Sequence, residues 1–275
     1  MLRSRVARHY DELSPYYRDL WGEHIHHGYY ARGDESRREA TEALIDLLAD
    51  ALGIETGATV LDVGCGVGGT SRYLARRRGC RVVGITLSAV QAQMARDGGR
   101  PQYEVDGFPR PEPHFVVGDA AALPFRGTFD RLLAMEVLSH VEDRGAFFDD
   151  ASRLLPPGGR VGIAAWLKAD DRPAEIVDAH VEPIERGMLV KLPNRQEYES
   201  NMARSGFDLI LYRDISSEVA RTWDLCLEII DRNTLWSLAA MKGRDVLEFL
   251  RSFRAMRRGF ASGTFRYALL VAEKR

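Results

Sequence analysis

The chain has 275 residues, of which 45% are hydrophobic and 28% charged, and its formal net charge is −2. A chain of this length can bury a core without disulfides or a structural metal, and its near-neutral charge excludes a global field that would attract nucleic acid. Three cysteines, Cys65, Cys80 and Cys226, lie far apart without metal-ligand spacing, which argues against a disulfide framework or a zinc site.

The sequence offers no segment suited to a membrane. No stretch approaches about 18 consecutive apolar residues, the length that a spanning helix needs. The first residues, MLRSRVARHYDELSPYY, carry positive charge but lack the apolar region of a secretory signal. We therefore expect a cytoplasmic protein.

Aromatic and histidine side chains are concentrated in residues 1–35, and residues 36–52 follow with apolar side chains at helical spacing. Gly53 is the expected end of this second segment, because glycine commonly follows the last turn of a helix. The aromatic and histidine side chains of the first segment include Tyr10, Tyr16, Tyr17, Trp21, His24, His26, His27, Tyr29 and Tyr30. We expect residues 1–35 to form an N-terminal helical arm.

Short apolar runs then alternate with helical stretches. We expect strands at 60–63, 81–85, 114–117, 129–135 and 160–166, with helices at 70–78, after Ser88, and up to about Leu155. Ser88 and Gln91 have the spacing of a capping box. Continuously apolar strands that alternate with helices are typical of a parallel sheet covered on both faces. The sequence therefore predicts an α/β fold with a Rossmann-like, doubly wound, mostly parallel sheet.

The alternation stops after Trp166. Late strands are expected at about 206–214 and 264–273, while 169–204 and 215–262 contain helical stretches with Trp223 and Trp236 in the second. No repeat or low-complexity linker divides the chain. We expect residues 1–275 to form a single domain, with a core at about 53–168, the late strands, and the two helical segments as a lid over an acceptor pocket.

The strongest chemical signal is VLDVGCGVGGT at residues 60–70. A strand that contains Asp62 leads into closely spaced glycines and then a helix. Glycines let the backbone turn sharply and approach a ligand, and the N-terminus of the helix presents free N–H groups to an anion. The spacing of Gly64, Gly66 and Gly69 also loosely fits the nicotinamide fingerprint, so the glycines alone leave both cofactor classes open.

This segment resembles the first motif of class I S-adenosylmethionine methyltransferases, an acidic residue followed by G-x-G-x-G, and the resemblance covers residues 58–166. Gly118-Asp119-Ala120, the run at 134–141 and the turn at 156–159 resemble later motifs of that family in the same order. The resemblance implies S-adenosylmethionine as cofactor, with Asp62 near its ammonium and Asp119 near its adenine amino group. The cofactor residues expected on this basis are Tyr17, Asp62, Gly64, Cys65, Gly66, Thr86, Leu87, Gln91, Gly118, Asp119, Ala120 and Met135.

One position departs from the family pattern. The second strand commonly ends in an acid that binds the ribose hydroxyls, whereas this chain has Thr86 there. The missing acid also counts against a nicotinamide cofactor. The segment Gly-Ile-Thr-Leu-Ser followed by Gln91 resembles the tocopherol methyltransferase-like subgroup, in which threonine is usual at this place.

The stretch from Trp21 to Tyr30 resembles the segment that tocopherol, sterol and natural-product methyltransferases fold over the cofactor. It implies that arm tyrosines cover the sulfonium, whose positive charge aromatic faces stabilise. It also implies that Trp21, His26 and Trp166 border the acceptor. The histidines of this stretch alternatively form a metal site or are simply packed, and since no further ligand joins them at metal-binding spacing we expect no metal.

Methyl transfer is an in-line displacement that depends on orientation, with a base for any proton that leaves the acceptor. Histidine suits that role because it titrates near neutral pH. His140 is the first candidate, since it follows the fourth strand at the ligand-binding edge of the sheet. His27, His26 and Glu23 are further candidates.

The expected activity is methyl transfer to a small hydrophobic acceptor of the secondary-metabolite, isoprenoid or quinol kind, with the methylated atom open. Three alternatives remain: cyclisation or rearrangement at the same cofactor site, a nicotinamide-dependent oxidoreductase, and a cofactor-sensing module without catalysis. We expect neither a nucleic acid partner nor a membrane span. A homo-oligomer is compatible with an arm that exchanges between subunits.

Overall fold

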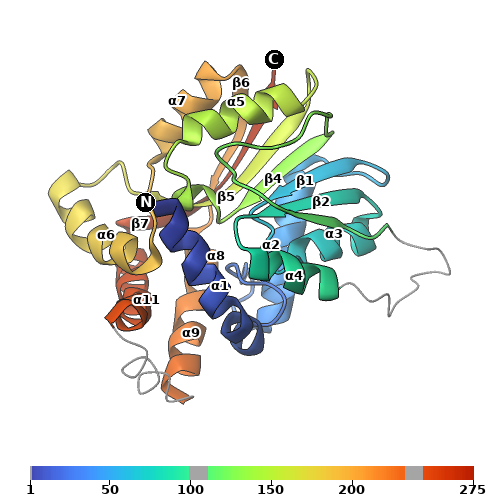
Figure 1. Ribbon diagram of the computed structural model, residues 1–275. Coiled ribbons are helices and arrows are strands. Elements are labelled where there is room, and N and C mark those ends of the chain that lie inside the picture. The colour runs from blue at the N-terminus through green and yellow to red at the C-terminus, as the bar shows by residue number, and fades with distance from the viewer. Residues whose placement is uncertain (1, 99–110, 233–243) are drawn as a thin grey trace.

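A single mixed sheet organises the part of the chain that the computed structural model describes, residues 2–98, 111–232 and 244–275. Seven strands in these residues are ordered β3-β2-β1-β4-β5-β7-β6, and β7 runs antiparallel to both of its neighbours, β5 and β6 (Figure 1). The strands are β1 Thr59–Val63, β2 Arg81–Thr86, β3 His114–Val117, β4 Arg131–Met135, β5 Arg160–Lys168, β6 Phe207–Asp214 and β7 Phe265–Lys274. The expected α/β, mostly parallel Rossmann-like sheet is confirmed.

All seven expected strands are present, with small differences at their ends. The strand expected from Phe129 begins at Arg131. The Phe129 N–H donates to the carbonyl of Leu154 at 2.9 Å instead of joining a neighbouring strand. This residue belongs to the loop between β3 and β4, and its hydrogen bond ties that loop to the last residue of α5.

The helices fall where the sequence places them. They are α1 Leu2–Trp21, α2 Arg37–Leu52, α3 Gly69–Arg78, α4 Ala89–Asp97, α5 Arg144–Leu154, α6 Ala174–Met188, α7 Arg195–Arg204, α8 Ser216–Val219, α9 Arg221–Arg232 and α11 Arg244–Ser262. A capping box of Ser36 and Glu39 begins α2, and Gly53 ends it with φ 64°. The helical prediction for Leu235, Trp236 and Leu238 lies outside the described residues.

Strand residues alternate between two apolar layers because successive side chains of a strand point to opposite faces. On β4, Leu133 belongs to the core that contains α2 and the lid helices, whereas Leu132 packs with Phe147 and Phe148 of α5. On that second face Tyr198 of α7 also contacts Phe148, with ring centroids 6.3 Å apart. The sheet is therefore covered on both sides.

The segment at 169–204, which we expected to form part of a lid, packs on both sides of the sheet. Its first helix, α6, lies beside α11, whereas α7 lies with α5 on the other side of the sheet (Figure 1). Tyr198 and Met202 bury the apolar side of α7 in that second core. Only α6 is therefore in a position to border a pocket on the lid side.

The arm helix α1 is fixed to α4 by a carboxylate. Asp11 accepts hydrogen bonds from the Ser88 hydroxyl at 2.5 Å and from the Val90 N–H at 3.3 Å. The Ser88 side chain also accepts from the Gln91 N–H, as the expected capping box requires. The reciprocal bond of that box is absent among the described residues, because the Gln91 side chain accepts from Thr86 instead.

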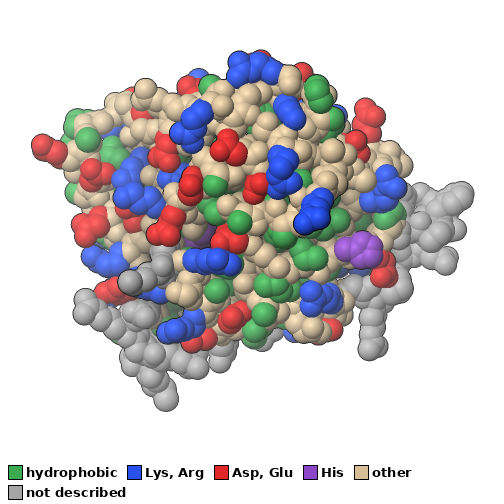
Figure 2. All heavy atoms as spheres, turned by 45° about the horizontal axis from the view of Figure 1, so that its top comes forward, with side chains coloured by type: hydrophobic (Ala, Val, Ile, Leu, Met, Phe, Trp, Pro, Cys, Tyr) green, Lys and Arg blue, Asp and Glu red, His purple; other side chains and the backbone are tan. Residues whose placement is uncertain are grey.

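Charge is mixed over the surface. Figure 2 shows acidic and basic side chains interspersed on the face that it presents, without a continuous area of one sign. Within the described residues, none of the helices combines the length and the apolar character that crossing a membrane requires.

The turn after β1 depends on a glycine that an alanine cannot replace. We expect Gly64→Ala to lower the free energy of unfolding more than Gly158→Ala. Both glycines have nearly the same φ, 77° and 76°, so each substitution costs about 1 to 2 kcal/mol of backbone strain. A Cβ at Gly64 would also lie 2.5 Å from Cβ of Val137, whereas Gly158 has open space, and such overlap costs about a further 1 to 3 kcal/mol. Urea unfolding of both variants measures the difference, and equal losses would contradict it.

Candidate cofactor and acceptor site

A pocket of about 380 Å³ lies at the carboxyl ends of β1, β2 and β4, where α1, α9 and α11 close it. Ligands in open α/β sheets bind at this edge. Every residue that the sequence assigns to the site lines the pocket except Trp21, whose side chain lies outside the described part. These lining residues are Tyr17, Glu23, His26, His27, Asp62, Gly64, Cys65, Gly66, Thr86, Leu87, Gln91, Gly118, Asp119, Ala120, Met135, His140 and Trp166.

The glycine loop forms the floor of the pocket. The N–H groups of Gly64 and Cys65 both donate to the carbonyl of Ile85, at 2.8 and 3.0 Å, which holds the loop against the end of β2. A Cβ added to Gly66 would meet nothing closer than 3.9 Å. The backbone at Gly66 therefore faces open space, and a bound molecule can approach it closely.

Asp62 is a buried acid without a cation. Its side chain is 2% exposed, and Oδ2 accepts a hydrogen bond from the Ser71 hydroxyl at 2.5 Å. Burial raises the pKa of this carboxyl to about 6, against the lowering effect of Ser71. No ion pair joins Asp62 to any described residue. A buried carboxylate needs a partner, and the ammonium of an amino acid moiety fits this position.

Polar groups at the ends of β2 and β3 form one wall of the pocket. The Thr86 hydroxyl donates to Oε1 of Gln91 at 2.7 Å and accepts from the Ser88 N–H at 3.4 Å, which leaves the Gln91 amide nitrogen and one Thr86 oxygen lone pair for a ligand. Asp119 accepts from the Ala121 N–H through Oδ1 and pairs with Arg3 of α1 through Oδ2, both at 2.9 Å. The arm thus contributes a positive charge beside Asp119.

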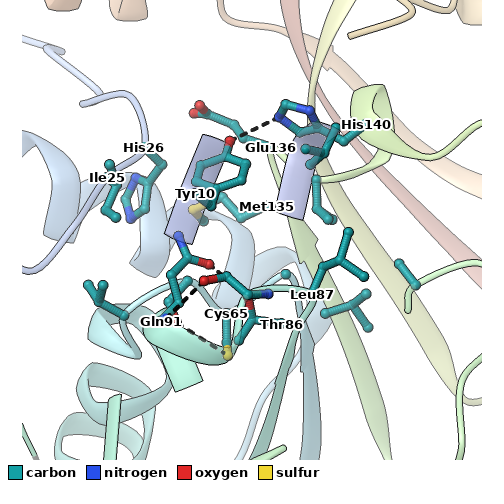
Figure 3. Close-up of a pocket in the computed structure, with 18 of the residues that line it drawn as sticks. Tyr10, Ile25, His26, Cys65, Thr86, Leu87, Gln91, Met135, Glu136 and His140 are labelled. Atoms are coloured by element: carbon teal, nitrogen blue, oxygen red, sulfur yellow. Dashed lines mark hydrogen bonds between the residues drawn. The ribbon is translucent and has the colours of Figure 1, made fainter. Parts of the chain in front are cut away.

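His140 has both ring nitrogens engaged. Nδ1 lies 3.1 Å from the carbonyl of Leu189 and must be the donor, so Nε2 accepts from the Tyr10 hydroxyl at 3.0 Å. Burial lowers the pKa of His140 to about 4. Figure 3 shows this pair across the pocket from Thr86 and Gln91. The imidazole is neutral at physiological pH, and its basic nitrogen is already hydrogen-bonded.

Glu136, directly after β4, has no role in the sequence-based assignment but is the most highly connected acid of the pocket. Its Oε1 accepts from the N–H and Nδ1 of His27, at 2.8 and 3.0 Å, and from the Tyr267 hydroxyl at 2.7 Å. Burial opposes ionisation, but the neighbouring His27 holds the pKa of Glu136 below its usual value. Its backbone has φ 54°, which is rare for a residue with a side chain.

The other two expected bases differ in their surroundings. His26 donates from Nδ1 to the carbonyl of His27 at 2.8 Å, so its Nε2 carries a lone pair, and burial lowers the pKa of its ring. The Glu23 side chain is 56% exposed and lies 4.0 Å from Arg72. Water competes for such a carboxylate, whereas the His26 ring lies inside the pocket.

The described residues contain no group of three or more His, Cys, Asp or Glu side chains that could hold a metal ion. His26 instead bonds to the backbone carbonyl of His27, and His27 bonds to Glu136. Tyr10 and Tyr17 of α1 line the pocket, as the resemblance implies, and Tyr16 has a side chain outside the described part.

Curated relatives match over most of the chain. A probable tocopherol O-methyltransferase of Oryza sativa is 34% identical over 201 residues, which cover 70% of this chain and 53% of that protein. The 27-O-demethylrifamycin SV methyltransferase of Amycolatopsis mediterranei is 29% identical over 273 residues, which cover 98% and 97%. The chain therefore spans about half of the first relative and nearly all of the second.

Solved structures share the fold. The cyclopropane synthase MmaA2 from Mycobacterium tuberculosis superimposes with a TM-score of 0.86 at 21% identity, covering 99% of this chain and 98% of that one. The [4+2]-cyclase SpnF superimposes with a TM-score of 0.83 at 24% identity, covering 98% and 94%. The family model described as mycolic acid cyclopropane synthetase matches residues 2–266. The chain belongs to this family of S-adenosylmethionine-dependent methyltransferases.

Proposed function

We propose that this protein transfers a methyl group from S-adenosylmethionine to a small, largely hydrophobic acceptor. The observation that carries the proposal is the unpaired, buried carboxylate of Asp62 under a glycine loop, at one end of a mostly apolar pocket. The names of the relatives, a tocopherol and a rifamycin methyltransferase, support a small-molecule acceptor.

The cofactor, when bound, supplies an electrophilic methyl group on a sulfonium. Asp62 would hold its ammonium, Thr86 with Gln91 its ribose hydroxyls, and Asp119 its adenine amino group. The arm closes over this end of the pocket through Tyr10 and Tyr17, and excluding water strengthens each of these polar contacts. The apolar walls orient the acceptor, which is the main requirement of a displacement at carbon.

His27 and Glu136 form a pair suited to removing a proton from the acceptor. The Nδ1–H of His27 donates to Glu136, so Nε2 carries the lone pair that can take a proton. The buried carboxylate would stabilise the resulting imidazolium and fix the ring tautomer, as in other carboxylate–histidine pairs. His140 and Glu23 stay alternative candidates, although the basic nitrogen of His140 is occupied by Tyr10.

Cyclisation or rearrangement in the same pocket is the second candidate. A [4+2]-cyclase shares this fold, and an apolar cavity that orients one substrate would serve such a reaction equally well. The mass of the product distinguishes the two, because only methylation adds a methyl group. The cytoplasmic location and a homo-oligomeric state remain predictions.

We expect calorimetric titration to give micromolar affinity for S-adenosylmethionine and S-adenosylhomocysteine, and none for reduced nicotinamide dinucleotide. Replacing Asp62 by Asn removes a charge-assisted contact, which should weaken binding roughly 10- to 100-fold. Asp130→Asn is the matched control, since Asp130 caps the amino end of the sheet through Thr59. Binding of the nicotinamide alone would overturn the assignment.

The affinity for S-adenosylhomocysteine should depend on pH through Asp62. Burial raises the pKa of the free carboxyl to about 6, and an ammonium favours the ionised form. Below pH 6 a proton must leave on binding, so affinity should fall by up to about tenfold per pH unit, and it should be flat between pH 7 and 8. Titrations at several pH values measure this. The same slope in Asp62→Asn would show that another group is responsible.

Turnover should depend on Glu136 and His27 more than on His140. For an acceptor that loses a proton, Glu136→Gln and His27→Ala should each lower the rate of S-adenosylhomocysteine production by a factor of about 10² to 10⁴. Cofactor affinity, measured separately, should change only a few-fold. His140→Ala should have a smaller effect on turnover. Loss of turnover in His140→Ala alone, with Glu136→Gln active, would assign the base to His140.

A further inference from the structure

Three rings meet in the acceptor part of the pocket. The centroid of His27 lies 5.8 Å from that of Trp166 and 5.1 Å from that of Trp223, and the two indoles are 6.4 Å apart. All three side chains are at least nine-tenths buried, with exposed fractions of 2%, 7% and 5%. They come from the arm, from β5 and from α9, so only the folded chain brings them together.

Each ring carries a polar atom that the protein leaves without a partner. Nε1 of Trp166, Nε1 of Trp223 and Nε2 of His27 make no hydrogen bond to any described residue. A buried indole N–H is normally paired, and an isolated unsatisfied group calls for an explanation. Three such atoms on neighbouring rings that line one pocket indicate a ligand group.

The identities of the three atoms define that group. Each indole nitrogen is a donor only. His27 donates from Nδ1 to Glu136, so its Nε2 is an acceptor in the neutral ring. Two donors and one acceptor match a hydroxyl, which accepts and donates at one oxygen. A carbonyl or an ether would leave Nε2 unpaired, and a hydrocarbon would leave all three unpaired.

We propose that the acceptor is a hydrophobic alcohol or phenol whose hydroxyl binds among Trp166, Trp223 and His27. The inference rests on the proposed function only in taking the occupant of this pocket as the acceptor. The hydrophobic part of the molecule would lie against Phe253, whose ring centroid is 4.9 Å from that of Trp223, and against the neighbouring Phe249. A hydroxyl in this place points its proton at the nitrogen that Glu136 keeps basic.

The test compares phenol with toluene, which have the same shape but differ by the hydroxyl. Protein labelled with ¹⁵N-tryptophan contains four indole N–H groups, and loss of a signal in Trp166→Phe or Trp223→Phe assigns two of them. We expect phenol to shift both assigned signals downfield and toluene to shift neither in that direction. Phenol should bind about tenfold more tightly than toluene, as expected for two or three added hydrogen bonds.

Each Trp→Phe substitution keeps the aromatic ring and removes the N–H, so the preference for phenol should fall severalfold. Tyr198→Phe is the control, because its buried hydroxyl also lacks a partner among the described residues but lies in the core on the other side of the sheet. That variant should keep the full preference.

Wild-type protein alone can overturn the proposal, so a variant that fails to fold does not matter. Indole signals that phenol leaves in place, or equal affinities for phenol and toluene, would show that these N–H groups bind water or pack unpaired. The titrations are run with and without S-adenosylhomocysteine. If S-adenosylhomocysteine failed to bind, the proposed function would be contradicted. The comparison of phenol with toluene without S-adenosylhomocysteine would still test this hydroxyl subsite.

Discussion

The side of the pocket that we propose for the acceptor depends on one buried carboxylate. Glu136 lies at the end of β4, and a single oxygen of its side chain accepts hydrogen bonds from His27 of the arm segment and from Tyr267 of β7. A buried anion is costly unless it is paired, so these bonds also hold the arm segment and the last strand in register with the centre of the sheet. The same bonds set the tautomer of His27 and therefore the polarity of the pocket that it faces.

The arm borders the side of the pocket that we propose for the cofactor, and one helix makes three polar contacts there. Arg3 pairs with Asp119, Asp11 caps α4 through Ser88, and Tyr10 donates to His140. Each partner lies at or just beyond the carboxyl end of a different strand, where the parallel strands leave a crevice. The arm therefore contacts the segments that follow β2, β3 and β4, and these contacts fix the helix whose Tyr10 and Tyr17 line the pocket.

Local chemistry explains how far the sequence could predict this structure. The parallel strands β1 to β5 are mainly apolar, and Asp62 and Thr86 lie within the last two residues of β1 and β2, so their positions follow from short segments. Glu136 could not be found in this way. Its partners are 109 and 131 residues away, and its positive φ leaves no sign in the residue type. The one sign of its role in the sequence is its position directly after β4, at the edge of the sheet where ligands bind. The path of α7 to the far side of the sheet likewise depended on the burial of Tyr198.

The two ends of the pocket are built by different means. The end of the pocket proposed for the cofactor is formed largely by the glycine loop and by residues at or just after the ends of β1, β2 and β3. The end proposed for the acceptor is lined mainly by side chains of the arm, β5 and the helices after Trp166. One cofactor site can therefore accompany many acceptors within a fold. The walls around His27 are apolar, so the few polar atoms there discriminate most strongly between substrates. A substrate that leaves these atoms unpaired carries the free-energy cost of removing them from water without gaining hydrogen bonds in return.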